Sequence, residues 1–350
     1  MHILAVDIGV GTQDIMVYDA DKGFEQAYKL VLPSPTRIFA NEVWKTQEDV
    51  LIFGDTIGGG PFTRAVLDHL REHKVYMTES AARSIRDDLE VVRGYGVEII
   101  AEDELEKMGE EAAPIKITDF TLQLFPFFES FGVDTCFDAI AIAVQDHGVA
   151  PKGMTDRENR FKLLEERLRG GSDTDGGVPV ESLAYLDGVP EHFSRMHSVY
   201  RSLKRWYEGH ILIMDTGAAA VLGALEDERV KGKSRVICVN VGNAHTIAMS
   251  LHEGQIAGVF EHHTHLLDKA RLEQYLQKLA AGTLSFKEVF DDGGHGALVR
   301  EANDPELIAV TGPGRSKMAG LGPFAAPAGD MMMTGPVGLI KAVESRLQSE

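Results

Sequence analysis

The chain has 350 residues, of which 44% are hydrophobic and 25% are charged, and its formal net charge at pH 7 is -19. Nucleic-acid binding draws most of its affinity from Lys and Arg, so this charge argues against nucleic acid and anionic membranes as partners, while the length favours two domains. Only two cysteines occur, Cys136 and Cys238, and they indicate neither a disulfide framework nor an iron–sulfur cluster within one chain.

The N-terminus carries a glycine-rich hairpin pattern. It lacks the basic and long apolar segments of a signal peptide, and no apolar run approaches the roughly 18 residues of a membrane span, so we expect a cytoplasmic protein.

A short apolar strand at residues 3–6 and another at residues 15–18 predict a hairpin with a polar tip from Asp7 to Asp14. The simplest explanation of this tip is a tight turn, because Gly accepts unusual backbone angles and Asp and Thr cap turns.

The rest of the first half is predicted to alternate strands and helices. A strand at residues 51–53 leads into the glycine-rich loop "GDTIGGGP", and a helix begins at Pro61, where the missing N–H of proline costs nothing. A helical, charge-rich stretch follows at about 79–111, and a buried strand at 139–144 ends in Gln145, Asp146 and His147. We place a first domain at residues 1–150, with an inserted subdomain at about 32–130.

The second half repeats the glycine-rich turn of the first half. Residues 151–210 are predicted to be a helical and loop insertion or linker, in which "GGSDTDGG" forms a loop between helices. A second domain is expected at residues 211–350. Its predicted elements are a strand at 211–214, an alanine-rich helix after Asp215, strands at 236–241, 246–251 and 255–260, a helix at about 265–281, a strand ending at Gly312 with a helix beyond, and a C-terminal helix.

Each half contains one glycine-rich tip, "DIGVGTQ" and "NVGNAHT". We expect the two tips to face each other across a cleft and to surround a polyphosphate. Backbone N–H groups in such turns bind anions without positive side chains, and carboxylates hold Mg²⁺, often through water. Asp7 and Thr12 would come from the first half, and Asn243 and Thr246 from the second, so an acidic protein can still bind ATP.

Five segments resemble, in order, the motifs of the actin, heat-shock-chaperone and sugar-kinase ATPase superfamily. "VDIGVGTQDIMVYD" is similar to its first phosphate motif, "VICVNVGNAHTIAMSL" to its second, "IAVTGPGRSKM" to its adenosine motif, and "IMDTGAAAVLGALED" and "AIAVQDHG" to its connecting segments. The resemblance implies an α/β protein of two ribonuclease H-like domains, with ATP and Mg²⁺ in the cleft between them and closure on nucleotide.

A narrower resemblance is to a largely archaeal family, DUF1786, labelled as related to activators of pyruvate formate-lyase. The three-cysteine cluster motif that the corresponding radical chemistry needs is absent from this sequence. The label therefore gives no support for that chemistry here.

The superfamily resemblance also implies roles for individual residues. Asp7 and Asp215 would hold Mg²⁺ through water, and Arg315 would stack on the base. Asp215 is a candidate catalytic base, with an N-cap on the alanine-rich helix as the alternative, while Gln145 and Asp146 would order the attacking water or simply form a polar strand end. The implied nucleotide-binding residues are Asp7, Gly9, Gly11, Thr12, Gln13, Gly242, Asn243, Ala244, His245, Thr246, Gly312, Pro313, Gly314 and Arg315.

Two residues depart from the second phosphate motif. Asn240 stands where Asp is usual, which removes one charge from the surroundings of the metal, and His245 stands where a small residue is common. We therefore expect slow turnover rather than loss of nucleotide binding.

Several histidines raise the question of a transition metal. "EHHTH" brings His262, His263 and His265 together in sequence, and three more histidines, His147, His245 and His295, lie in glycine-bordered turns. Imidazole suits zinc or iron, but alternate residues of a strand face opposite ways and no ligand spacing is fixed, so substrate contact or ordinary loop structure is the favoured interpretation. The loop at Gly58–Gly60 is either a second anion site at a helix N-terminus or a packed turn.

Two classes of function fit these motifs. One is an ATPase that hydrolyses ATP to activate or remodel a partner protein. The other is a kinase that transfers the γ-phosphate to a hydroxyl or carboxylate of a small metabolite, with Asp215 or Asp146 as base. Asn240, the lack of a recognisable sugar-recognition motif and the acidic composition favour the ATPase, and a nucleotide-binding protein without turnover is a third possibility.

Overall fold

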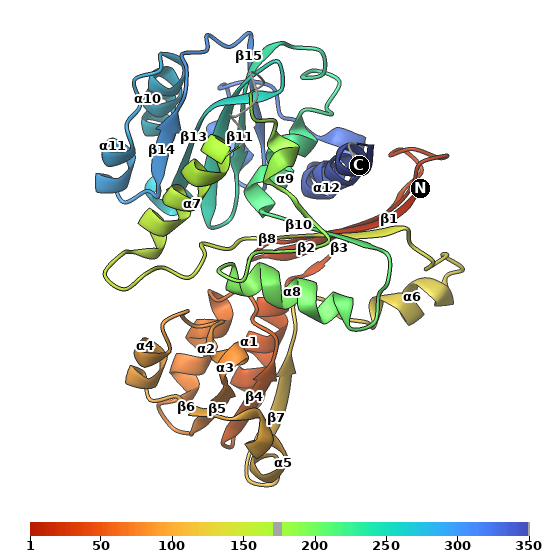
Figure 1. Ribbon diagram of the computed structural model, residues 1–350, viewed down its shortest axis with the longest axis vertical. Coiled ribbons are helices and arrows are strands. Elements are labelled where there is room, and N and C mark those ends of the chain that lie inside the picture. Colours follow the sequence, from red (N-terminus) through yellow and green to blue (C-terminus); the bar gives the residue numbers. More distant parts are fainter. Residues whose placement is uncertain (171–176, 349–350) are drawn as a thin grey trace.

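A computed structural model describes residues 1–170 and 177–348 as three α/β units (Figure 1). A central sheet lies across the middle of Figure 1, an inserted unit lies below it, and a second sheet unit lies above it. Most of the loop predicted at "GGSDTDGG" falls outside the described residues. Within the described ranges, no helix combines the length and apolar character needed to cross a membrane.

The central sheet has the strand order β3-β2-β1-β8-β10-β9. β1, β2 and β3 form an antiparallel meander, and β8 and β10 extend the sheet in parallel from β1. β1 and β8 are buried along almost their whole length, which is why they read as continuous apolar runs in the sequence. The strands are β1 (His2–Ile8), β2 (Thr12–Asp19), β3 (Tyr28–Pro33), β8 (Ala139–Val144), β9 (Tyr185–Leu186) and β10 (His210–Met214).

The inserted unit lies between β3 and β8 and has its own core. Its parallel sheet has the order β6-β5-β4-β7, and Ile52, Phe62 and Met77 are fully buried in it. The strands are β4 (Val50–Gly54), β5 (Val75–Thr78), β6 (Glu98–Ile100) and β7 (Ala113–Ile117). The helices are α1 (Pro35–Lys45), α2 (Pro61–His69), α3 (Glu79–Ala82), α4 (Leu89–Gly94) and α5 (Leu105–Met108), and α6 (Leu124–Ser130) follows β7.

The upper unit repeats the meander of the central sheet. β11, β12 and β13 are antiparallel, and β15 joins β11 in parallel, just as β8 joins β1. The sheet order is β14-β13-β12-β11-β15. Its elements are β11 (Arg235–Val241), β12 (His245–His252), β13 (Gln255–His263), α10 (Lys269–Ala280), α11 (Phe286–Asp291), β14 (Gly296–Val299) and β15 (Leu307–Thr311).

The structure corrects three predictions about elements and boundaries. The second domain was predicted from residue 211, whereas β10 pairs with β8 in the first sheet. The single helical stretch predicted at about 79–111 consists of short helices around β6, because Gly96 ends a turn at φ 100° and the apolar segment after it pairs with β5. The helix predicted from about residue 265 begins at Lys269, where Asp268 caps it by accepting a bond from Arg271 N–H.

Two helices cross between the repeated sheets, α9 (Thr216–Ala224) and α12 (Thr334–Gln348) (Figure 1). α12 packs on β1 and β8, and α9 packs on β11, β12 and β15. A Cβ at Gly223 would collide with the Thr334 carbonyl group, and one at Gly338 with the Ala219 carbonyl group. The two helix backbones therefore touch directly where the domains meet.

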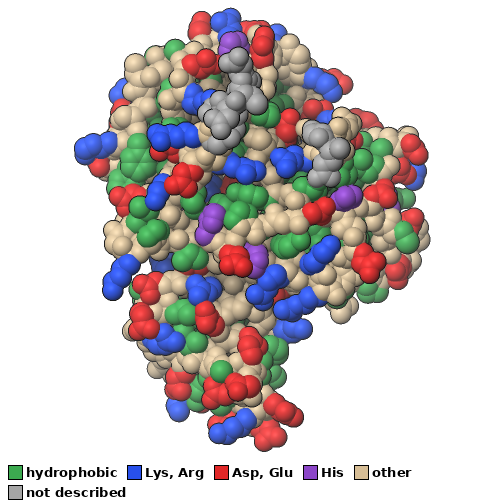
Figure 2. Space-filling view, viewed as in Figure 1, with side chains coloured by type: hydrophobic (Ala, Val, Ile, Leu, Met, Phe, Trp, Pro, Cys, Tyr) green, Lys and Arg blue, Asp and Glu red, His purple; other side chains and the backbone are tan. Residues whose placement is uncertain are grey.

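The remaining two helices come from the segment predicted as an insertion or linker. α7 (Asp156–Gly170) packs against β14 of the upper unit, and α8 (Ser194–Lys204) packs against β10 of the central sheet. In Figure 1, α8 lies between the central sheet and the inserted unit. Acidic and basic side chains are interspersed over the face shown in Figure 2.

Candidate functional site

A cavity of about 610 Å³ opens where the three units meet, a volume typical of small-molecule sites. Its walls come from the β1–β2 and β11–β12 turns, the segment after β8, the start of α9 and α12, and the Gly58–Gly60 loop. The predicted site residues that line it are Asp7, Gly9, Thr12, Gln145, Asp146, Asp215, Gly242, Asn243, Ala244, His245, Gly312 and Pro313. Five predicted residues, Gly11, Gln13, Thr246, Gly314 and Arg315, are outside this lining.

The two glycine turns have the same backbone hydrogen bond. Gly9 N–H donates to the Thr12 carbonyl, and Gly242 N–H donates to the His245 carbonyl, each at 2.9 Å. The turns also meet, because a Cβ at Gly11 would lie 2.7 Å from the Asn243 side-chain nitrogen. The structure thus brings together the two tips that the sequence predicts on opposite sides of a cleft.

Two buried carboxylates lie at the base of the first turn. Asp7 and Asp14 are register partners, each 9% exposed, and Oδ1 of each lacks a hydrogen-bond partner among the described residues. Burial raises the pKa of Asp7 to about 7, and burial followed by repulsion from Asp7 raises that of Asp14 to about 8. Unpaired carboxylate oxygens are ligands for a hard cation, so this pair fits Mg²⁺.

The sequence analysis identified Asp7 and missed Asp14 as a site residue. Asp14 lies inside β2, and only its pairing with Asp7 across the hairpin shows that the two carboxylates share one place. The start of α12 closes on the same place, since a Cβ at Gly335 would collide with the Asp7 carboxylate. Gly335 is therefore a further residue that shapes this part of the cavity.

Asp215 has the geometry of an N-cap and also contacts an arginine. Its Oδ1 accepts a bond from Gly217 N–H at 2.9 Å, and its Oδ2 accepts one from Arg160 at 2.9 Å. The N-cap alternative is thus present in the structure, while the carboxylate still lines the cavity. Its role as a base or metal-water ligand stays a prediction.

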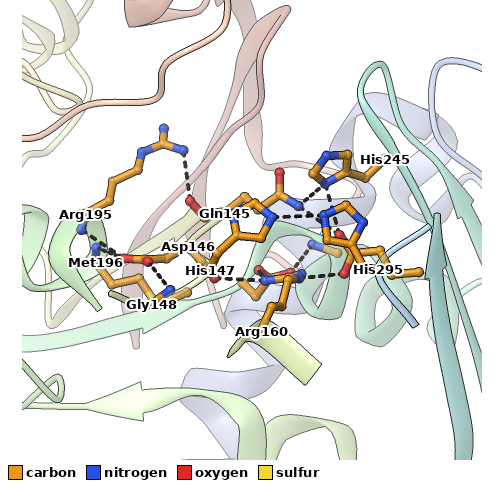
Figure 3. Close-up of polar contacts among 12 residues, drawn as sticks. Gln145, Asp146, His147, Gly148, Arg160, Arg195, Met196, His245 and His295 are labelled. Carbon is orange, nitrogen blue, oxygen red and sulfur yellow. Dashed lines mark hydrogen bonds and ion pairs between the residues drawn. The ribbon is translucent and has the colours of Figure 1, made fainter. Parts of the chain in front are cut away.

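Asp146 is held by the backbone at the start of α8 (Figure 3). Its carboxylate accepts bonds from the backbone N–H groups of Gly148, Arg195 and Met196 at 2.8 to 3.0 Å. Burial nevertheless raises the pKa of Asp146 to about 6. This arrangement matches the strand-end alternative, and a part for Asp146 in ordering water stays a prediction.

The segment predicted to contact adenosine forms a turn after β15. Gly312 has φ 92°, and a Cβ there would lie 2.5 Å from Asn240 Oδ1, so this position requires glycine. Gly314 N–H donates to the Val241 carbonyl at 2.9 Å. The helix predicted beyond the turn is only a 3-10 turn, Arg315–Met318.

Arg315 lies beside an aromatic ring. Its guanidinium lies 5.7 Å from the centroid of the Phe324 ring, and Arg315 is absent from the cavity lining. The guanidinium thus contacts a protein ring, and its stacking on a nucleotide base stays a prediction.

The Gly58–Gly60 loop closes the cavity from the inserted unit. A Cβ at Gly58 would lie 3.0 Å from the Arg195 guanidinium, and Arg195 pairs with Asp119 at 2.6 Å. Gly60, at φ 62°, precedes α2, and Thr36 donates its hydroxyl proton to the Gly59 carbonyl. The loop has the contacts of a packed turn, and it also lines the cavity.

A histidine cluster, defined as His147, His245, His295 and Glu261, lines another part of the cavity (Figure 3). One ligand atom from each member lies within 4.8 Å of those of the other three. His147 follows β8 of the first sheet, whereas the other three belong to the upper unit. The sequence analysis named all three histidines but not Glu261.

Of the "EHHTH" segment only Glu261 belongs to this cluster, because strand residues alternate between faces. β13 places Glu261 and His263 on one face, with His263 opposite His245 on β12. His262 has its Nε2 3.4 Å from an Asp292 oxygen, and His265 is exposed. The pairing of β12 with β13 is the signal that would have pointed to Glu261.

Burial and one arginine shift the pKa values of His147, His295 and Glu261. Burial lowers the pKa of His147 to about 3 and that of His295 to about 2, so both rings are neutral. Burial opposes the charge of Glu261, but the Arg160 guanidinium at 2.6 Å holds the pKa of that carboxyl well below its ordinary value. Arg160 also bonds Asp215, so it links the cluster to the start of α9.

The two repeated sheets, each with a meander, a parallel neighbour to its first strand and a glycine turn at the cavity, define a two-domain actin-like ATPase fold, as the sequence predicts. Residues 57–317 match the family described as "Putative pyruvate format-lyase activating enzyme (DUF1786)", and the chain belongs to that family. A comparison with curated proteins found no match.

Solved structures of similar architecture share little sequence with this chain. A ROK hexokinase from Thermus thermophilus is 11% identical, with 100% of this chain and 90% of that chain covered and a TM-score of 0.31. A protein with an actin-like ATPase fold from Bacteroides thetaiotaomicron is 8% identical, with 96% and 95% covered and a TM-score of 0.36. An inorganic polyphosphate/ATP-glucomannokinase from an Arthrobacter strain is 12% identical, with 99% of each covered and a TM-score of 0.36.

Proposed function

We propose that the protein binds ATP with Mg²⁺ in the cavity and hydrolyses it to activate or remodel a partner protein. The observation that carries this proposal is the meeting of the two glycine turns beside a pair of buried carboxylates, Asp7 and Asp14. Backbone N–H groups in such turns bind phosphates without lysine side chains, so the acidic composition of the chain is compatible with an anionic ligand.

Each part of the cavity has a place in this function. The turns containing Gly9 and Gly242 would cradle the phosphates, and the turn at Gly312 would lie against the nucleoside. Asp7 and Asp14 would hold the metal ion, which supplies neutralisation of phosphate charge when bound. Asp215, oriented by Arg160, would accept a proton from the attacking water.

A second candidate function is that of a small-molecule kinase. It is supported by the extent of the cavity. Beyond the phosphate turns, the lining continues into the inserted unit with Arg83, Arg86 and the Gly58–Gly60 loop. Space for a second substrate, with cations beside it, would let the γ-phosphate pass to a hydroxyl or carboxylate instead of water. Asp215 would then take the proton of the accepting hydroxyl.

Calorimetric titration with ATP, ADP and a non-hydrolysable analogue, each with Mg²⁺, tests the binding step. We expect binding by the unmodified protein and its loss in Asp7→Ala, with Asp19→Ala at the exposed end of β2 as the matched control. Absence of binding to the unmodified protein would contradict both candidates. Phosphate release without any acceptor, reduced in Asp215→Asn, would favour the ATPase, and release only with an added metabolite would favour the kinase.

A further inference from the structure

We propose that His147, His245, His295 and Glu261 form a binding site for a divalent transition-metal ion, of the zinc or iron type, that joins the two domains. Three imidazoles and one carboxylate are a donor set suited to these ions, whereas Mg²⁺ and Ca²⁺ prefer oxygen ligands. The proposed nucleotide site assigns its roles to other side chains of the cavity, and the two sites are linked through Arg160, which bonds both Asp215 and Glu261.

The spacing of the four side chains is close to that around one ion. Nε2 of His147 lies 3.1 Å from Nε2 of His295, and Nδ1 of His245 lies 3.0 Å from Oε1 of Glu261. Ligands held at about 2.0–2.2 Å from a tetrahedral ion lie about 3.4 Å from each other. Since all four atoms already fall within 4.8 Å of one another, the farthest pair needs to approach by at most about 1.4 Å to close around an ion.

Two histidines of the cluster, His147 and His295, pair through their rings with each other, whereas the Nδ1 of His245 contacts Gln145 and Glu261. His295 is 1% exposed, yet its Nδ1 has no hydrogen-bond partner within the part of the chain that the structure describes. Its Nε2 faces the Nε2 of another histidine, His147. A buried imidazole normally satisfies its nitrogens with other groups, so the unpaired Nδ1 of His295 and a pairing of two imidazoles with each other are features that a bound metal ion would explain.

Outer contacts fix the carboxylate in the orientation that a ligand requires. Arg160 binds Oε2 of Glu261 at 2.6 Å, which leaves Oε1 facing His245. Gln145 donates to the same Oε1 at 3.0 Å. The backbone N–H of His295 donates to the backbone carbonyl of Glu261 at 2.9 Å, which holds these two members of the cluster side by side. Contacts of this kind hold ligands in place in metal proteins.

The origin of the ligands gives the ion a mechanical consequence. His147 lies three residues after the end of β8 in the first sheet, while His245, Glu261 and His295 come from the upper unit. An ion bound by all four would therefore cross-link the two domains at the cavity and restrain their opening. Removing His147 alone would leave the upper-unit ligands in place and release this restraint.

Metal titration of the tag-free, chelator-stripped chain tests the proposal. Co²⁺ would be followed by its visible absorption, and Zn²⁺ by competition with a chromophoric chelator. We expect one ion per chain, and a loss of affinity of at least about 100-fold in His147→Ala and in Glu261→Gln, beyond the 10–100-fold typical of losing an outer contact. The matched control is His252→Ala, an exposed histidine paired with Glu301.

The outcomes separate this proposal from its alternatives. Unchanged affinity in His147→Ala, an equal loss in His252→Ala, or no saturable binding of either ion by the unmodified chain would overturn it. If His147→Ala does not fold, His147→Gln and the Co²⁺ spectrum of the unmodified chain decide, because nitrogen ligation in a tetrahedral site gives intense absorption and surface binding does not. Retained metal binding in Asp7→Ala would show the site to stand apart from nucleotide binding.

Discussion

The two glycine turns share a backbone and differ in the side chains that they bring to the cavity. The register pair at the base of the first turn is Asp7 with Asp14, and the corresponding pair of the second turn is Asn240 with Ile247. Thr12 of the first turn corresponds to His245 of the second, since each provides the carbonyl that accepts the turn's hydrogen bond. Repetition of the fold thus fixes positions, while single substitutions place carboxylates at one turn and an imidazole at the other.

This difference divides the cavity chemically. The first turn presents buried oxygen ligands suited to Mg²⁺, and the second presents part of the histidine cluster, suited to a softer ion. Four substitutions that change the side chains of one turn or the other test this difference, and each has a measurable expected result.

The largest expected effect comes from removing charge at the first turn. Asp7→Asn should weaken binding of ATP with Mg²⁺ by more than about 100-fold, because losing a charged oxygen ligand should exceed the roughly 10–100-fold effect of losing an outer contact. Calorimetry in the presence and absence of Mg²⁺ measures it, with Asp19→Asn as control. If Mg²⁺ dependence persists in Asp7→Asn, the first turn is not the magnesium site.

Replacing the histidine of the second turn with the threonine found in the first turn should weaken transition-metal binding. His245→Thr is expected to weaken Co²⁺ and Zn²⁺ binding by about 100-fold while leaving nucleotide affinity within about twofold, because the turn's hydrogen bond uses the backbone of residue 245. Metal titration and calorimetry on one preparation test both halves of the statement. An equal loss of both ligands would show that the turn acts as a single unit.

A smaller effect is expected on stability and its dependence on pH. The folded-state pKa of Asp14 is raised above its unfolded value, so the folded state binds this proton more tightly and stability falls as pH rises from about 4 through about 8. Asp14→Asn should therefore raise the free energy of unfolding at pH 8.5 by on the order of 2 kcal/mol, since one pKa unit corresponds to about 1.4 kcal/mol.

Denaturant unfolding across this pH range measures the effect. The advantage of Asp14→Asn should vanish near pH 4, where the aspartate is protonated in both states. Asp19→Asn, whose hydrogen bond to Lys22 lowers its pKa, should give no such gain. A stability difference that does not change with pH would mean that Asp14 is not the titrating group.

The smallest effect is expected from restoring the carboxylate that the second turn lacks. Asn240→Asp places a charge where the phosphate motif usually has one, and we expect the rate of phosphate release to rise by about 10-fold, about 1.4 kcal/mol of transition-state stabilisation. Asn240→Ser is the matched variant without charge. No gain in Asn240→Asp would indicate that slow turnover, if observed, has another cause.

The sequence predicted those parts of the molecule whose signals are local. β8 was predicted with its observed bounds because a doubly buried parallel strand is a continuous apolar run. Asp7 was found because it adjoins a glycine motif. The sheet to which β10 belongs was not predictable in this way, since an apolar run does not reveal its partner strand.

The histidine cluster shows most clearly why the rest could not be predicted. His147 and Glu261 are separated by more than a hundred residues and meet only when β8 and β13 are assembled into different sheets that face one cavity. The choice of Glu261 over the neighbouring His262 depends on which face of β13 turns inward. Both the meeting of these residues and the inward face of β13 are set by tertiary structure, so no characteristic spacing of residues in the sequence reveals them.

The glycine contact between α9 and α12 has a consequence for movement. Ordinary helix pairs interlock through ridges of side chains, and this interlocking opposes rotation of one helix on the other. At Gly223 and Gly338 the backbones touch with no side chain between them, so this crossing opposes rotation of one helix on the other less than interlocked side chains would. Small rotations there would be magnified with distance from the crossing, so the parts of each domain farthest from these two glycines would travel most when the domains open.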